Sequence, residues 1–320
     1  QGSQRDVRGR RPLARPATWM KPIRIGLIGF GTVGRGTYEV LQRNQHEIAR
    51  RAGRGIEVAA ITVRDVDKAR AIVGSKVPIS SDFNDVIRNP DIDIVVELIG
   101  GYEPAYALAL EAITRGKHVV TANKAMLARH GNQLFDAARS HGVMIAFEAA
   151  VAGGIPIIKA LREGLTANRI EWIAGIINGT SNFILSEMRS RGITFDAALE
   201  EAQRLGYAEA DPTFDVEGID AAHKLAILSS IAFGVPINID AVYTEGITHL
   251  AKEDIKYAEQ LGYRIKLLGI TKRTAAGIEL RVHPTLVPLQ RLIANVEGAM
   301  NAILIKGDAV GTTLYYGQGA

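Results

Sequence analysis

The sequence contains no cysteine among its 320 residues. This absence excludes a disulfide framework, a thiolate nucleophile and a zinc or iron–sulfur centre held by cysteine. No run of 18 or more apolar residues occurs, so we expect no membrane span. GxSxG and Walker A sequences are also missing, which excludes the serine-hydrolase elbow and P-loop chemistry. The lack of cysteine fits a reducing cytoplasm, and we expect a cytoplasmic protein.

Basic residues only slightly outnumber acidic ones, with 38 Lys+Arg against 34 Asp+Glu. The resulting net charge of +4 is carried by residues 1–19, which hold five arginines and one aspartate. This segment has almost no apolar periodicity, and we expect a disordered basic leader that is either not native or an over-long gene start. A basic arm is the less favoured interpretation, so we expect no nucleic-acid partner.

From residue 20 to about 150, short β-prone apolar runs alternate with helical patterns. Such alternation is typical of an α/β fold with a doubly wound parallel sheet. A glycine-rich break at 151–156 ends the alternation, and residues 151–310 predict a second, α+β domain. In the first domain we predict strands at 23–28, 56–63, 92–99, 118–121 and 143–147.

A GxGxxG sequence stands between the first predicted strand and the first predicted helix. Glycines there allow a tight turn, close approach of the backbone to a pyrophosphate, and close packing of helix on strand. We therefore expect a Rossmann-type NAD(P)-binding domain at 20–150, with Gly100 after a further strand as another cofactor contact. The second strand ends at Arg64-Asp65, and because an arginine accommodates a 2′-phosphate, Arg64 favours NADP over NAD. The predicted pyrophosphate turn consists of Gly29, Phe30, Gly31, Thr32, Val33 and Gly34.

Two lysines, Lys124 and Lys224, are candidate catalytic residues. Lys124 directly follows a strand, at the edge where open α/β sheets bind ligands, and can reach a phosphate, a carboxylate or a developing alkoxide. Lys224 lies four residues after Asp220 on one helix face. That pair is either a surface ion pair or a lysine held ready as a proton donor to a carbonyl.

Five carboxylates precede Lys224 within 12 residues. Such a block can bind a divalent cation or a cationic substrate group, although Pro212 and Phe214 break the spacing of a calcium loop. The residues alone leave both interpretations open. The five carboxylates are Glu209, Asp211, Asp215, Glu217 and Asp220.

Three segments together resemble the homoserine dehydrogenase family, from Ile23 to the end of the chain. They are 25–34, 121–124, and 177–185 taken with the acidic block. The resemblance implies reversible NAD(P)H-dependent reduction of L-aspartate 4-semialdehyde to L-homoserine, on the way to threonine, methionine and isoleucine. It further implies a homodimer formed through the second domain. Measured against that family, residues 311–320 are the start of a segment that returns to the nucleotide domain, and we expect the chain to be truncated there.

The resemblance also assigns roles to individual residues. It implies Lys224 as the proton donor, Lys124 beside nicotinamide and substrate, and Asp220 and Glu209 as holders of the substrate's amino end. It implies a monovalent cation, Na⁺ or K⁺, bound by the loop after Phe147. The cation ligands would be the backbone carbonyls of Glu148, Val151, Gly153 and Ile155.

Two other classes compete with this interpretation. A related two-domain oxidoreductase with another aldehyde substrate would share the glycine turn, but the register of the acidic block disfavours it. A non-catalytic NAD(P)-binding protein, or a truncated inactive core, would be favoured by loss of the lysine or of the acidic block. Neither is lost, so the sequence predicts an enzyme.

Overall fold

The computed structural model describes residues 21–319, so the predicted basic leader at 1–19 lies outside the described residues. The chain divides in sequence into two compact units between Ile99 and Gly100. The predicted domain boundary near residue 150 falls inside the second unit and stays a prediction. Among the described residues, no helix has both the length and the apolar character that crossing a membrane requires.

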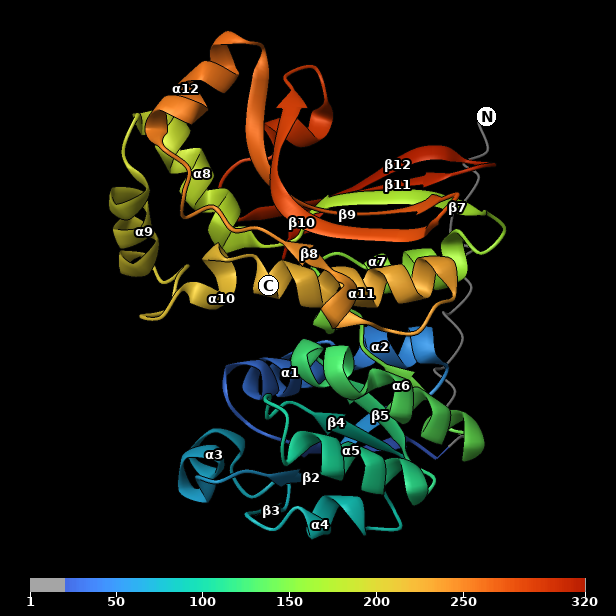
Figure 1. Cartoon of the computed structure of the whole chain (residues 1–320). Helices are drawn as coiled ribbons and strands as arrows, with labels where there is room; N and C mark the ends of the chain where they lie inside the picture. The colour runs from blue at the N-terminus through green and yellow to red at the C-terminus, as the bar shows by residue number, and fades with distance from the viewer. Residues whose placement is uncertain (1–20, 320) are drawn as a thin grey trace, which may run out of the picture. The chain divides into compact units, whose positions relative to one another are not determined.

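Residues 21–99 form parallel strands in the order β3-β2-β1-β4 (Figure 1). Most of their side chains are apolar, and Leu27, Ile28, Ile61 and Val95 are fully buried, as expected for strands covered on both faces. The elements are β1 Ile23–Ile28, α1 Thr32–Arg43, α2 Gln45–Ala52, β2 Ile56–Thr62, α3 Val66–Val73, β3 Ile79–Ser80, α4 Asn84–Ile87 and β4 Ile94–Glu97.

The helical pattern that follows the glycine turn forms two helices, because α1 ends at Arg43 and α2 begins at Gln45. Asn44 separates them with a non-helical backbone, in keeping with the weak helix preference of asparagine. Val33 and Val40 of α1 are exposed. The C-cap of α3 is Gly74.

The second unit begins with α5 Ala105–Thr114, β5 His118–Thr121, α6 Lys124–Ser140 and β6 Ile145–Ala146, and β5 and β6 pair in parallel. Short turns follow, namely η1 Glu148–Ala150, α7 Ile157–Lys159 and η2 Ala160–Gly164. The helices beyond them are α8 Gly179–Arg191, α9 Phe195–Arg204, α10 Thr213–Val216, α11 Ile219–Phe233, η3 Ile239–Ala241, α12 Lys252–Gln260 and η4 Leu292–Asn295.

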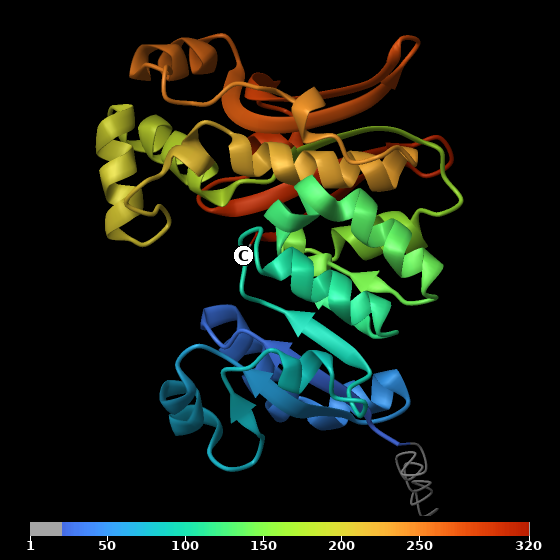
Figure 2. The same cartoon turned by 60° about the horizontal axis from the view of Figure 1, so that its bottom comes forward.

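A mixed sheet in this unit has the strand order β12-β11-β7-β9-β10-β8, antiparallel except for β8 against β10. Helix α11 runs along one face of the sheet (Figure 1), and α8 and α9 pack side by side at one end (Figure 2). The strands are β7 Ile170–Ile176, β8 Tyr243–Thr244, β9 Tyr263–Thr274, β10 Gly277–Pro288, β11 Met300–Gly307 and β12 Gly311–Gln318.

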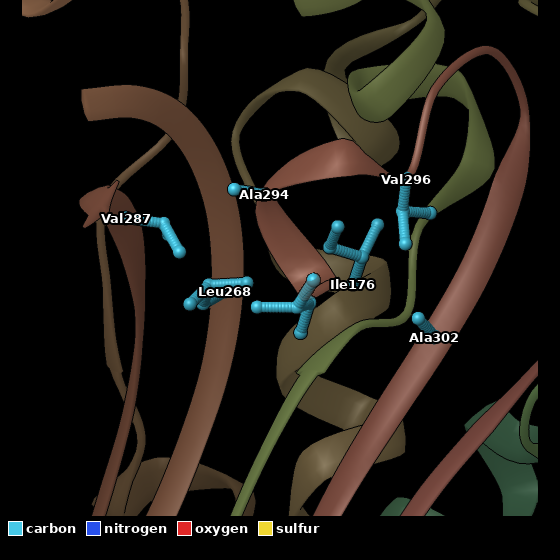
Figure 3. Packing of buried hydrophobic residues seen from close by; sticks show 7 residues of the cluster. Ile176, Leu268, Val287, Ala294, Val296 and Ala302 are labelled. Atoms are coloured by element: carbon cyan, nitrogen blue, oxygen red, sulfur yellow. The ribbon is translucent and has the colours of Figure 1, made fainter. Parts of the chain in front are cut away.

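Buried aliphatic side chains join this sheet to the segment around η4. Ile176, Leu268, Val287 and Ala302 come from four different strands and meet Val296 in one cluster (Figure 3). The predicted fold class, a Rossmann-type doubly wound parallel sheet plus a second α+β domain, is confirmed.

Candidate functional site

The glycine turn between β1 and α1 has the geometry that pyrophosphate binding requires. Gly29 has φ +101°, and a Cβ there would lie 2.8 Å from the carbonyl oxygen of Leu98. A Cβ on Gly34 would strike the carbonyl oxygen of Gly29, whereas Gly31 faces open space. Among residues 21–319, no side chain caps the N-terminus of α1, so its first N–H groups are available to an anion.

The remaining residues of this turn differ in what they can offer a cofactor. The Phe30 ring is buried edge-on against Tyr38, 5.8 Å between centroids, so only its backbone can approach a ligand. Thr32 and Val33, in the first turn of α1, are exposed. Gly100, the first residue of the second unit, has φ +72° and open space where a Cβ would stand.

Arg64 and Asp65, which follow β2, differ in the contacts that their side chains make. The Asp65 carboxylate accepts a hydrogen bond from the Lys68 N–H at 3.0 Å and so caps α3. Arg64 is exposed, and within the described residues its guanidinium has no ion-pair or hydrogen-bond partner. The Asp65 carboxylate is therefore engaged in a helix cap, while the Arg64 guanidinium remains available.

Asp220 and two lysines meet in the second unit. Lys224 Nζ lies 2.7 Å from Asp220 Oδ2, and Lys124 Nζ lies 2.7 Å from Oδ1 of the same carboxylate. The Asp220 side chain is 2% exposed, against 12% for Lys224 and 34% for Lys124. The sequence predicted the Asp220–Lys224 pair from helical spacing, but no sequence spacing indicated that Lys124 would share the carboxylate.

Each lysine is also held by a second group. Lys224 Nζ donates to the backbone carbonyl of Ile177 at 2.9 Å. Lys124 is the first residue of α6, whose cap is Asn123, and its Nζ lies 5.8 Å from the ring centroid of Phe214. The ammonium groups are thus fixed around one carboxylate by α6, α11 and the residue that follows β7.

The electrostatics of Asp220 depend on this arrangement. Burial by itself would raise the pKa of its carboxyl, but the ammonium groups of Lys224 and Lys124 outweigh burial and lower the pKa to about 2. Asp220 is therefore an anion throughout the neutral range. On α11, burial lowers the pKa of His223, which keeps this neighbour uncharged at neutral pH.

Sequence reasoning missed Asn178, which links the site together. Its Nδ2 donates to Asp220 Oδ2 at 2.8 Å and to Asp215 Oδ1 at 2.7 Å. Its Oδ1 accepts from the Ser181 N–H at 2.8 Å and caps α8. The available signal was an asparagine directly before a helix, which predicts the cap but not the link to the acidic block.

The five carboxylates of the acidic block do not form one cluster, which corrects the simple cation-site interpretation. Asp211 accepts from the Thr213 N–H at 3.1 Å, and Glu217 accepts from the Thr248 hydroxyl at 2.9 Å. Glu209 is exposed, and its carboxylate has no hydrogen-bond or ion-pair partner in the part of the chain that the structure describes. Nowhere in residues 21–319 do three or more His, Asp or Glu side chains gather as a metal would need.

The loop after Phe147 is shaped by its backbone. The Glu148 carboxylate accepts the N–H groups of Ile158 and Lys159 at 2.8 and 3.0 Å. Ala152 has a left-handed backbone with φ +49°. The carbonyls of Val151 and Gly153 accept no hydrogen bond from any described residue. The carbonyls of Glu148 and Ile155 each accept a backbone hydrogen bond, from Val151 at 3.5 Å and from Ile157 at 2.7 Å.

Comparison with known proteins places these features in context. Residues 29–148 match the family model "Homoserine dehydrogenase, NAD binding domain", and residues 156–320 match the model "Homoserine dehydrogenase". A homoserine dehydrogenase of Pseudomonas aeruginosa is 66% identical over 301 residues, covering 94% of this chain and 69% of the relative.

Solved structures of homoserine dehydrogenases are also similar to this chain. A homoserine dehydrogenase from Thiobacillus denitrificans has a TM-score of 0.91 at 69% identity, over 94% of this chain and 69% of that one. A hyperthermophilic archaeal homoserine dehydrogenase in complex with NADPH has a TM-score of 0.79 at 27% identity, over 94% and 92% of the two chains.

Proposed function

Because the chain belongs to the homoserine dehydrogenase family and is an oxidoreductase, we propose that Lys124, Asp220 and Lys224 form the centre at which it interconverts L-aspartate 4-semialdehyde and L-homoserine. The observation that carries this proposal is one buried carboxylate held between two ammonium groups at 2.7 Å each. A reaction that creates an alkoxide needs a proton donor next to it, and this arrangement supplies one.

Lys224 is the proton donor in this proposal. An ammonium group has three N–H bonds, and Lys224 directs two of them to Asp220 Oδ2 and the Ile177 carbonyl. The third remains for the aldehyde oxygen, which takes the proton as it becomes a hydroxyl. A bound nicotinamide would supply the hydride in this direction and accept it in the other. In the direction of oxidation, Lys224 recovers the proton from the substrate hydroxyl.

Lys124 and Glu209 have distinct proposed roles. Lys124 is the more exposed of the two lysines, so its ammonium can also attract an anionic part of substrate or cofactor. Asp220 already faces two ammonium groups, and its share in holding the substrate's amine is smaller than the sequence suggested. Glu209, whose exposed carboxylate has no hydrogen-bond or ion-pair partner in the described chain, is the better partner for that amine.

NADP is the proposed nicotinamide cofactor. The supporting observation is that Asp65 caps α3 whereas Arg64 remains available for a 2′-phosphate. The glycine turn fits a pyrophosphate, because Gly31 faces open space in front of the uncapped N-terminus of α1. NAD is the alternative, and a cytoplasmic location likewise stays a prediction.

We also propose that the loop after Phe147 binds Na⁺ or K⁺. Its donor set is chemically suited to a hard monovalent cation, because it consists of oxygens alone. The Val151 and Gly153 carbonyls accept no hydrogen bond from the described chain and would bind the ion most readily. The Glu148 and Ile155 carbonyls would use their second lone pairs.

A homodimer is proposed on the basis of one face of the mixed sheet. Leu314, Leu304, Ala174 and Ile270 stand side by side across four neighbouring strands and are half-buried. A contiguous row of apolar side chains on an open sheet face is typical of a surface that a partner covers. The molar mass in solution, measured by light scattering, should be twice that of one chain.

The experiment that tests the reaction is homoserine-dependent reduction of NADP⁺, followed by the nicotinamide absorbance in Na⁺ and in K⁺. Lys224→Ala should lose almost all turnover while binding NADPH as the original protein does. Lys256→Ala, which changes an exposed lysine on α12, is the control and should keep full activity. A Lys224→Ala variant that retains most of its turnover would contradict the proposed proton donor.

A further inference from the structure

The side chain of Asn178 is buried, 5% exposed, and each end of its carboxamide has a defined partner. The oxygen accepts from the Ser181 N–H, and the two hydrogens of the nitrogen go to Asp215 and Asp220. The orientation of the amide follows from these contacts, because the reversed amide would place an oxygen against two carboxylates and an NH₂ group against an N–H.

A helix cap alone does not require this residue. Serine, threonine and aspartate cap helices as well as asparagine does, because each offers an oxygen to the free N–H groups. Only a carboxamide combines that acceptor with two donors. An aspartate at this position would set a third carboxylate against Asp215 and Asp220. The bridge to the two carboxylates, not the cap, therefore accounts for asparagine at position 178.

The bridge acts on the same oxygen that holds Lys224. Asp220 Oδ2 accepts from Asn178 Nδ2 at 2.8 Å and from Lys224 Nζ at 2.7 Å. The neighbouring residue Ile177 binds the same Nζ through its carbonyl. Two consecutive residues after β7 therefore fix both the ammonium group and its counter-ion, which leaves one direction for the remaining N–H of Lys224.

We propose that Asn178 is a positioning residue for the reaction, holding Asp220 so that Lys224 keeps its proton aimed at the substrate oxygen. This inference rests on the proposed role of Lys224. Asn178 also compensates the repulsion between Asp215 and Asp220 by donating one hydrogen bond to each. Without the amide, Asp220 can rotate toward Lys124 and carry Lys224 away from its present direction.

The charges around the bridge come from three elements. Asp215 belongs to α10, Lys124 to α6, and Asp220, His223 and Lys224 to α11. Burial raises the pKa of the Asp215 carboxyl, an effect that the Asn178 hydrogen bond opposes and the Asp220 charge reinforces. Removing the amide should therefore raise the pKa of Asp215 further and shift the acidic side of the activity profile to higher pH.

The decisive variant is Asn178→Ser, which preserves a capping oxygen and removes the two donors. We expect kcat to fall roughly ten- to hundredfold, because small displacements of catalytic groups have effects of this size. The KM for homoserine should change little, and the acidic limb of kcat should move to higher pH. Asn178→Asp also preserves the cap, and its activity relative to the original protein should improve as pH falls and the added carboxylate is protonated.

The control for loss of a cap is Thr194→Ala on α9, where the hydroxyl accepts from the Ala197 N–H. This variant should keep the original kcat and pH profile. Asn178→Ser with unchanged kcat and profile would overturn the inference. Loss of NADPH binding in both the Ser and Asp variants would overturn it too, because the side chain would then serve folding. Lys224→Ala in the same assay separates the two ideas, since its outcome tests the proton donor alone.

Discussion

Lys266 on β9 allows a quantitative test of the electrostatics of the second unit. Its side chain is 2% exposed, and Nζ donates to the Val296 carbonyl at 2.5 Å and to Asn182 Oδ1 at 3.1 Å. Burial, and to a lesser degree the like charges of Arg264 and Arg189, lower the pKa of Lys266 to about 8 from an ordinary 10.5, although Glu297 at 3.6 Å opposes the shift.

The sign of the resulting pH dependence is set by the direction of this shift. The unfolded chain binds the Lys266 proton more tightly than the folded one, so stability rises with pH between the two pKa values. Because the pKa falls from 10.5 to about 8 on folding, the buried ammonium lowers the free energy of unfolding by about 3 kcal/mol at pH 7. About 2 kcal/mol of this loss is recovered by pH 9.5.

The perturbation is Lys266→Met, which retains most of the volume and removes the titrating group. The free energy of unfolding in urea is measured for both proteins at several pH values from 7 to 9.5. Over this range, the free energy of unfolding of the original protein should rise by about 2 kcal/mol relative to that of the variant. Loss of the hydrogen bonds to Asn182 and Val296 changes the stability difference between the two proteins by the same amount at every pH. It therefore does not affect how that difference varies with pH.

Lys256→Met, at an exposed position of α12, is the matched control. Its stability difference from the original protein should not change with pH over this range. A stability difference between Lys266→Met and the original protein that stays constant from pH 7 to 9.5 would refute the reasoning. Lys266 would then titrate outside this range despite its burial.

Three further substitutions test the two candidate binding and catalytic regions. Asp220→Asn should cost about 2 kcal/mol of stability above pH 4, a difference that disappears as pH falls toward the folded pKa of about 2, and it should also reduce turnover. Gly34→Ala should weaken NADPH binding in titrations, because its Cβ would strike the Gly29 carbonyl, whereas Gly36→Ala in the same helix faces open space and should bind normally. Arg64→Ser should raise the KM for NADP⁺ at least about tenfold with little change for NAD⁺, since a charge-assisted contact contributes roughly 1.5–3 kcal/mol; equal effects on both cofactors would contradict the role of Arg64.

Local features were predictable from the sequence because they depend on short spacings. The turn at 29–34 requires glycines at fixed positions after a strand, and these can be read directly. The same holds for Asp220 and Lys224, which share a helix face because of the helical period. Alternation of apolar runs with helical patterns sufficed for the fold class, since parallel strands need long crossover connections.

The tertiary structure decided which distant residues meet. Lys124 shares the Asp220 carboxylate only because α6 and α11 pack together, and Asn178 reaches it from the end of β7. Glu209 and Asp220 lie in one acidic block, yet one carboxylate is exposed and the other is enclosed by two lysines. Sequence spacing constrains the backbone over a few residues, whereas burial and ion pairing depend on how several elements pack. The sequence therefore determined the reaction family and the Asp220–Lys224 pair, and the packing brought Lys124 and Asn178 to the same carboxylate.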